Sequence, residues 1–111
     1  MTLQDIINGK GEFKEFPLKN GATYRSKEIA LPIVCADGTK LSVQASHTHY
    51  CDPRNDEGPY STVEVGYPTV TPPRSWKPYA DGEYPSDIYA HVPVALVRRF
   101  VKRHGGEATN A

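Results

Sequence analysis

The sequence has no long apolar run, no net charge and only two cysteines, and each shortage excludes a class of protein. Its longest apolar stretch, residues 29–35, is interrupted by Pro32 and is far shorter than the about 20 residues that a membrane-spanning helix needs. Thirteen basic and thirteen acidic side chains cancel. We therefore expect no transmembrane helix and no general affinity for nucleic acid or acidic membranes.

The chain also lacks a basic start followed by an apolar segment, which is the pattern of a secretory signal. We therefore predict a cytoplasmic protein. Because the cytosol is reducing and 111 residues can build a core of their own, Cys35 and Cys51 are predicted to be free thiols.

Turn-forming and aromatic residues are abundant instead. Ten prolines, nine glycines and seven tyrosines favour short strands joined by tight turns over a helical bundle. We predict one α+β domain, residues 1–111: an antiparallel sheet of five to six strands, with a short N-terminal helix and a C-terminal helix packed on one face of the sheet.

Local patterns place these elements along the chain. Thr2 is the expected N-cap of the first helix, and Pro93 opens a helix over residues 94–104. Strands are predicted at residues 12–18, 22–27, 29–35, 41–45, 62–67 and 88–92. Residues 68–87 are predicted to form an ordered covering loop, and residues 107–111 to fray.

The hairpin between residues 29–35 and 41–45 allows a prediction of register. Apolar residues alternate on both strands, so the two apolar faces must coincide. We predict the loop Asp37-Gly38-Thr39 with Gly38 in the left-handed conformation. This register pairs Cys35 with Leu41, Ile33 with Val43 and Leu31 with Ala45. The inward series is completed by Val63, Val65 and Tyr67 on a later strand.

His47, His49 and Cys51 continue the odd-numbered series of strand 41–45. In a straight strand they would extend its core face as a polar floor for a ligand. Ordinary hydrogen-bonded histidines are the other open interpretation. A closed zinc site needs four ligands, and the sequence offers no second pair at a recognisable spacing, so no metal site is predicted.

Four cations and no acid lie on the C-terminal helix, at Arg98, Arg99, Lys102 and Arg103. Such residues complement the helix dipole and commonly form a solvated face. Alternatively, Arg99 and Arg103 lie one turn apart and could clamp a phosphate with their forked donors. Both interpretations stay open.

Trp76 and Tyr79, in residues 68–87, either pack under their loop or stack on a flat ligand. Arg54 could serve the same ligand or pair with the acids beside it. No phosphate-binding glycine loop, nucleophile elbow or zinc-protease motif occurs in the sequence, so we predict neither catalysis nor a cofactor.

The layout of several segments resembles small phage and prophage proteins. These segments are Leu41–Ser46, His49–Arg54, Val63–Pro68, Val92–Val97 and His104-Gly105-Gly106. Such proteins include antagonists of host defence, among them sponges for cyclic nucleotide signals such as those of Thoeris systems, and anti-CRISPR proteins that act by protein contact. The resemblance implies a β-sheet with a terminal helix that holds a nucleotide through aromatic residues and arginines.

We therefore predict a non-enzymatic phage accessory protein that sequesters a small phosphorylated, nucleotide-like immune signal as a homo-oligomer. The predicted ligand-binding residues are His47, His49, Arg54, Trp76, Tyr79, Arg99 and Arg103. The alternative is an anti-CRISPR-type inhibitor whose basic helix contacts a host defence protein. A small enzyme or metal-binding protein is the lesser alternative.

Overall fold

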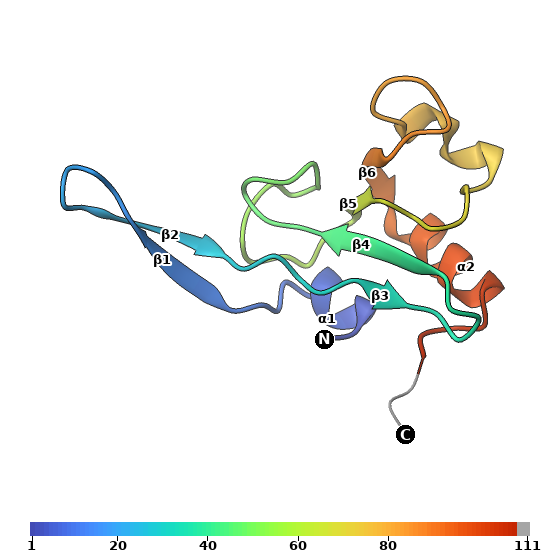
Figure 1. The fold of residues 1–111 in the computed structure, drawn as a ribbon, viewed down its shortest axis with the longest axis horizontal. Helices are drawn as coiled ribbons and strands as arrows, with labels where there is room; N and C mark the ends of the chain where they lie inside the picture. Colours follow the sequence, from blue (N-terminus) through green and yellow to red (C-terminus); the bar gives the residue numbers. More distant parts are fainter. Residues whose placement is uncertain (109–111) are drawn as a thin grey trace.

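A computed structural model describes residues 1–108, and the rest of the segment predicted to fray, 109–111, lies outside the described residues. The predicted α+β class is confirmed (Figure 1). In the described part, six strands form two antiparallel sheets. The elements are α1 (Leu3–Ile7), β1 (Phe13–Pro17), β2 (Thr23–Lys27), β3 (Ile33–Val34), β4 (Lys40–Gln44), β5 (Thr62–Gly66), the 3-10 helix η1 (Arg74–Tyr79), β6 (Ile88–Pro93) and α2 (Val94–Arg103).

The larger sheet, in the order β3-β4-β5-β6, carries the core. Alternate residues of β4 and β5 are buried, as a strand with one covered face requires. One stripe of α2 packs against them, and α1 adds its own apolar face. The main contributors are Leu3, Ile6, Ile7, Leu41, Val43, Val63, Val65, Val97, Phe100 and Val101.

The N-terminal helix begins as predicted. The Thr2 hydroxyl accepts a hydrogen bond from the Asp5 backbone N–H at 3.1 Å, and the Asp5 carboxylate accepts one from the Thr2 N–H at 3.0 Å. This reciprocal capping satisfies two of the donors that a helix start leaves free.

The predicted register of the β3–β4 hairpin is wrong by two residues. Ile33 pairs with Leu41 and Val34 with Lys40, and the Cys35 N–H donates to the Thr39 carbonyl at 2.7 Å. The loop is therefore Ala36-Asp37-Gly38, with Gly38 left-handed at φ 91°. Because a two-residue shift keeps the parity of each strand, the predicted inward faces of Ile33 and Leu41 survive.

The N-terminal half of the predicted 29–35 strand does not join the sheet. Ile29 and Leu31 are 74% and 83% exposed, which contradicts their predicted inward orientation. Here the side-chain amide of Gln44 takes the place of backbone hydrogen bonds between strands. It accepts a hydrogen bond from the Ala30 N–H and donates one to the Ala30 carbonyl, both at 2.9 Å. Pro32, which lacks an N–H, could not continue a full ladder.

Two further expectations need correction. Tyr67, predicted to point inward, is 67% exposed, because β5 ends at Gly66 and Tyr67 itself takes a positive φ of 50°. The segment predicted to fray is held at residues 107–108: the Ala108 N–H donates to the Val34 carbonyl at 2.7 Å. This segment follows the outer edge of β3.

Strands β1 and β2 form a separate two-stranded sheet, the arm (residues 13–27), which projects from the main body (Figure 1). The strands predicted at residues 12–18 and 22–27 are confirmed, and they pair as a hairpin with Phe13 opposite Lys27 and Phe16 opposite Tyr24. All residues of β1 are exposed. Of the helices in residues 1–108, none is long and apolar enough to cross a membrane.

Candidate functional site

The predicted ligand-binding residues fall into two groups near opposite ends of β4. Trp76, Arg99 and Arg103 line a groove between η1 and α2, and the C-terminal end of α2 lies at the start of β4, where Thr39 contacts His104. His47, His49 and Arg54 follow the end of β4. The structure therefore does not join all of the predicted residues into one site.

The η1–α2 groove has a volume of about 350 Å³. It forms because η1, inside the segment predicted to be an irregular covering loop, runs beside α2 as a short 3-10 helix. The lining residues are Pro73, Ser75, Trp76, Leu96, Arg99, Phe100 and Arg103. The lining thus combines apolar side chains with one serine and two arginines.

Trp76 belongs to the core. Its side chain is 1% exposed, and its ring lies 5.5 Å from the ring centres of both Tyr89 and Phe100. The prediction that Trp76 stacks on a ligand does not fit this packing, whereas local packing under the loop does. Tyr79 is half-buried against the same core.

Arg99 and Arg103 are exposed and carry their charge without a carboxylate partner in residues 1–108. Arg98, by contrast, donates to the Gln4 side chain at 2.8 Å. The prediction that Arg99 and Arg103 share one face of the helix is confirmed by their common groove. Their unpaired charges, one turn apart, are free to meet an anion.

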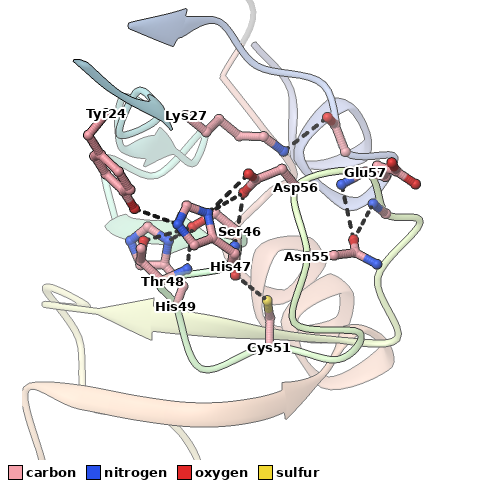
Figure 2. A network of polar contacts seen from close by, with 12 residues as sticks. Tyr24, Lys27, Ser46, His47, Thr48, His49, Cys51, Asn55, Asp56 and Glu57 are labelled. Atoms are coloured by element: carbon pink, nitrogen blue, oxygen red, sulfur yellow. Dashed lines mark hydrogen bonds and ion pairs between the residues drawn. The ribbon is translucent and has the colours of Figure 1, made fainter. Parts of the chain in front are cut away.

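The second group lies in turns, because β4 ends at Gln44 and the chain bends at Ser46. The expected straight continuation through His47, His49 and Cys51 is therefore wrong. The Ser46 hydroxyl contacts the Thr48 N–H at 3.1 Å and the Nδ1 atom of His49 at 2.6 Å (Figure 2). A serine hydroxyl that accepts a hydrogen bond from a nearby backbone N–H is typical of turns. Because that N–H is then not available to a neighbouring strand, the strand ends here.

His47 links the arm to the body through both ring nitrogens (Figure 2). Its Nδ1 atom lies 3.0 Å from each carboxylate oxygen of Asp56, and its Nε2 atom lies 2.5 Å from the Tyr24 hydroxyl. The His47 backbone N–H also donates to Asp56 at 2.9 Å. We call these residues the Tyr24–His47–Asp56 chain.

The loop that carries Asp56 is braced on both sides. The side-chain oxygen of Asn55 accepts hydrogen bonds from the N–H groups of Glu57 and Gly58, at 3.0 and 3.1 Å. The Tyr60 hydroxyl donates to the Asn55 carbonyl at 2.7 Å. Asp56 is thus held in place by its own loop as well as by His47.

Cys51 and Cys35 are buried and free, as predicted. Burial raises the pKa of both thiols, so neither has the lowered pKa of a reactive cysteine. Burial also lowers the pKa of His49, which favours its neutral form. Across the described residues, no cluster of three or more histidine, cysteine or acidic side chains could hold a metal ion.

Arg54 is exposed and lies 5.5 Å from the centre of the Tyr50 ring. No acid of residues 1–108 forms an ion pair with it, including the flanking ones. Asp52 instead contacts the Nδ1 atom of His91 at 2.9 Å. The structure therefore places Arg54 over an aromatic ring, away from the groove that holds Arg99 and Arg103.

Acid should weaken the fold through Asp56. Burial opposes its charge, but hydrogen bonds from the His47 backbone and ring outweigh burial and lower the pKa of Asp56 below its usual 3.8. In the unfolded chain this carboxylate takes up a proton first, so the stabilisation is present above about pH 4 and is lost as the pH falls further. Melting temperatures should therefore fall as the pH drops below about 4.

The pKa values of Asp5, Asp37 and Asp52 are lowered as well, so they contribute in the same direction. Asp56→Asn removes one of these groups and should reduce the acid-induced drop without abolishing it. An equal drop in the variant and the unaltered protein would show that Asp56 does not contribute.

Sequence reasoning missed Tyr24 and Asp56. Asp56 is one of the acids near Arg54, and Tyr24 lies in the strand predicted at residues 22–27, but no motif singles out either residue. The sequence offers one signal for the contact between Asp56 and His47. Asp56 follows His47 by nine residues, and a short loop can bring two such residues together. Nothing in the local pattern around Tyr24 predicts its contact with His47.

No protein-family model, no curated protein and no solved structure matches the chain.

Proposed function

We propose that this chain is a non-enzymatic binding protein for a small phosphorylated, nucleotide-like ligand, held in the η1–α2 groove. One observation carries the proposal: Arg99 and Arg103 line the same groove, and neither has a carboxylate partner in residues 1–108. Two like charges one turn apart repel each other, and a bound phosphate relieves that repulsion.

The groove suits the rest of such a ligand. A volume of about 350 Å³ lies within the range of about 300–1,000 Å³ of small-molecule sites. Leu96 and Pro73, both half-buried, offer apolar surface for a base, while the guanidinium forks fit phosphate oxygens. Tyr79, on η1, is half-buried against the core and is not among the residues that line this groove.

The role that we propose for this binding is sequestration. A protein that holds a phosphorylated immune signal in the host cytoplasm, as a homo-oligomer, would act as a sponge of the kind that the sequence resembles. Sequestration requires that the protein binds the signal tightly and is abundant, and it requires no catalytic group. The residues of the groove offer ion pairing and apolar contact to such a ligand.

Arg99→Ala and Arg103→Ala should each weaken binding by about 1.5–3 kcal/mol, which is about 10- to 150-fold in Kd. Charge-assisted contacts to phosphate supply this energy, while exposed cations contribute little to folding, so the melting temperature should stay nearly unchanged. Calorimetric titration with cyclic nucleotides and cyclic ADP-ribose isomers measures the loss. Arg103→Lys keeps the charge without the fork and should lose part of the affinity.

Arg98→Ala is the matched control, because Arg98 neighbours Arg99 on the same helix but bonds to Gln4. It should leave binding unchanged. To identify the ligand, the protein is purified directly from host lysate and denatured, and the released small molecules are analysed by mass spectrometry. Equal affinity of all three alanine variants would contradict the proposed site.

A protein inhibitor is the second candidate function, and the arm is the observation that favours it. The exposed apolar side chains of Phe13, Phe16 and Leu18 lie along a projecting two-stranded sheet, and such side chains commonly mark a contact surface. No binding across the ligand panel, together with a host-protein complex that survives purification, would favour this function over the first.

A further inference from the structure

We propose that Tyr24 is an activated nucleophile that accepts an acyl group from an ester or thioester. In this proposal His47 is the general base and Asp56 is the positioning residue. The inference is independent of the η1–α2 groove, because it rests on the Tyr24–His47–Asp56 chain (Figure 2).

In the neutral form of His47, the hydrogen-bond partners determine which ring nitrogen carries the proton. An ionised carboxylate only accepts hydrogen bonds, so Asp56 holds the proton of neutral His47 on Nδ1. The Nε2 atom is then left as an acceptor, and the Tyr24 hydroxyl donates to it at 2.5 Å. A hydroxyl, an imidazole and an orienting carboxylate in this order form the arrangement that activates a nucleophile.

The base is held firmly, while the nucleophile is accessible. Asp56 contacts both the backbone N–H and the ring of His47, and Asn55 braces the Asp56 loop. Tyr24, on the arm, is 41% exposed. A rigid base beside an accessible hydroxyl is what attack on a ligand from solvent requires.

The neighbouring surface favours an uncharged acyl donor. Tyr24 lies opposite Phe16 on the arm, and Phe16 lines a second groove, of about 500 Å³, together with Ile29, Thr48 and His49. The cations at this groove are already engaged. Lys14 pairs with Glu28 at 2.8 Å, and Lys27 donates to the Gly9 carbonyl at 3.1 Å and to Tyr60 at 3.3 Å.

The step balances without a further reactant. The Tyr24 oxygen attacks the acyl carbon as its proton passes to Nε2 of His47. The new C–O bond forms, the bond to the leaving oxygen or sulfur breaks, and the leaving group takes the proton from His47. The products are O-acyl tyrosine and a free alcohol or thiol, with His47 neutral again.

The test uses p-nitrophenyl acetate with the intact protein. Release of p-nitrophenolate gives the rate, and peptide mass spectrometry locates the acetyl group. Tyr67, which is 67% exposed and contacts no histidine in the described structure, is the internal reference. Tyr24 should be acetylated about 100-fold faster than Tyr67, the lower end of the range for general-base catalysis.

Variants separate activation from a purely structural contact. His47→Gln keeps a hydrogen-bonding side chain but cannot take up the proton, so the Tyr24 rate should fall to that of Tyr67. In His47→Ala, added imidazole should restore part of the Tyr24 rate and leave Tyr67 unaffected. Asp56→Asn should slow Tyr24 without slowing Tyr67.

Two results would overturn the proposal. The first is equal acetylation of Tyr24 and Tyr67 in the unaltered protein, a comparison that needs no variant to fold. The second is an unchanged release of p-nitrophenolate in Tyr24→Phe with the acetyl group found on His47, which would make the imidazole itself the nucleophile.

Discussion

Replacing Trp76 by alanine should lower the free energy of unfolding by about 3–5 kcal/mol, the range for removing a large aromatic residue from a core. The side chain is 1% exposed and lies between Tyr89 of β6 and Phe100 of α2. Its loss would leave a cavity where η1, the sheet and α2 meet. Thermal and urea denaturation, followed by circular dichroism, measure the effect.

Trp76→Phe is the matched control, because it keeps an aromatic ring and should cost much less than alanine. The same experiment separates the two roles considered for this residue. If Trp76 stacked on a ligand, Trp76→Ala would weaken ligand binding and leave the melting temperature of the protein unchanged. That outcome would contradict the core position of Trp76.

Gly9→Ala should also destabilise the fold strongly, because a Cβ atom at Gly9 would lie 1.9 Å from the Glu57 carbonyl oxygen. Backbone meets backbone at this point, so no side chain can move aside to make room. Relief requires the end of α1 and the loop that carries Asp56 to separate, at a cost above the about 1–3 kcal/mol of an unfavourable backbone conformation alone. Urea denaturation gives the free energy.

Gly21→Ala provides a closely matched control. Gly21 has a φ of +84° and Gly9 one of +83°, but nothing lies within 4 Å of a Cβ atom built at Gly21. Both variants carry the same backbone strain, and Gly9→Ala alone carries the clash. Equal destabilisation by the two substitutions would show that the packing of α1 against the Asp56 loop relaxes freely.

Period-two alternation predicted the faces of the strands well and their pairing less well. The inward positions of Ile33, Leu41 and Val43 follow from alternation alone, and the structure confirms them. Gly38 is left-handed as predicted, but it is the third residue of the loop and not the second. The resulting two-residue shift leaves the alternation unchanged, so alternation could not reveal it. Ile29 was misplaced because the side chain of Gln44 occupies the hydrogen bonds of the neighbouring backbone.

The two groups of site residues differ in how far the sequence could predict them. Arg99 and Arg103 share a helix, so helical geometry alone puts them on one face. The contact of His47 with Tyr24 spans 23 residues and depends on how the arm leaves the body. Such a contact follows from tertiary packing, which no local pattern around either residue encodes.

The short segment after α2 protects the sheet from other chains. Strand β3 is the outermost strand of the larger sheet, and residues 106 and 108 occupy hydrogen-bonding groups along its free side. An open strand edge is a template for aggregation. Because these residues follow every strand and α2 in the chain, a ribosome-bound chain carries the exposed edge until after the whole sheet has been made.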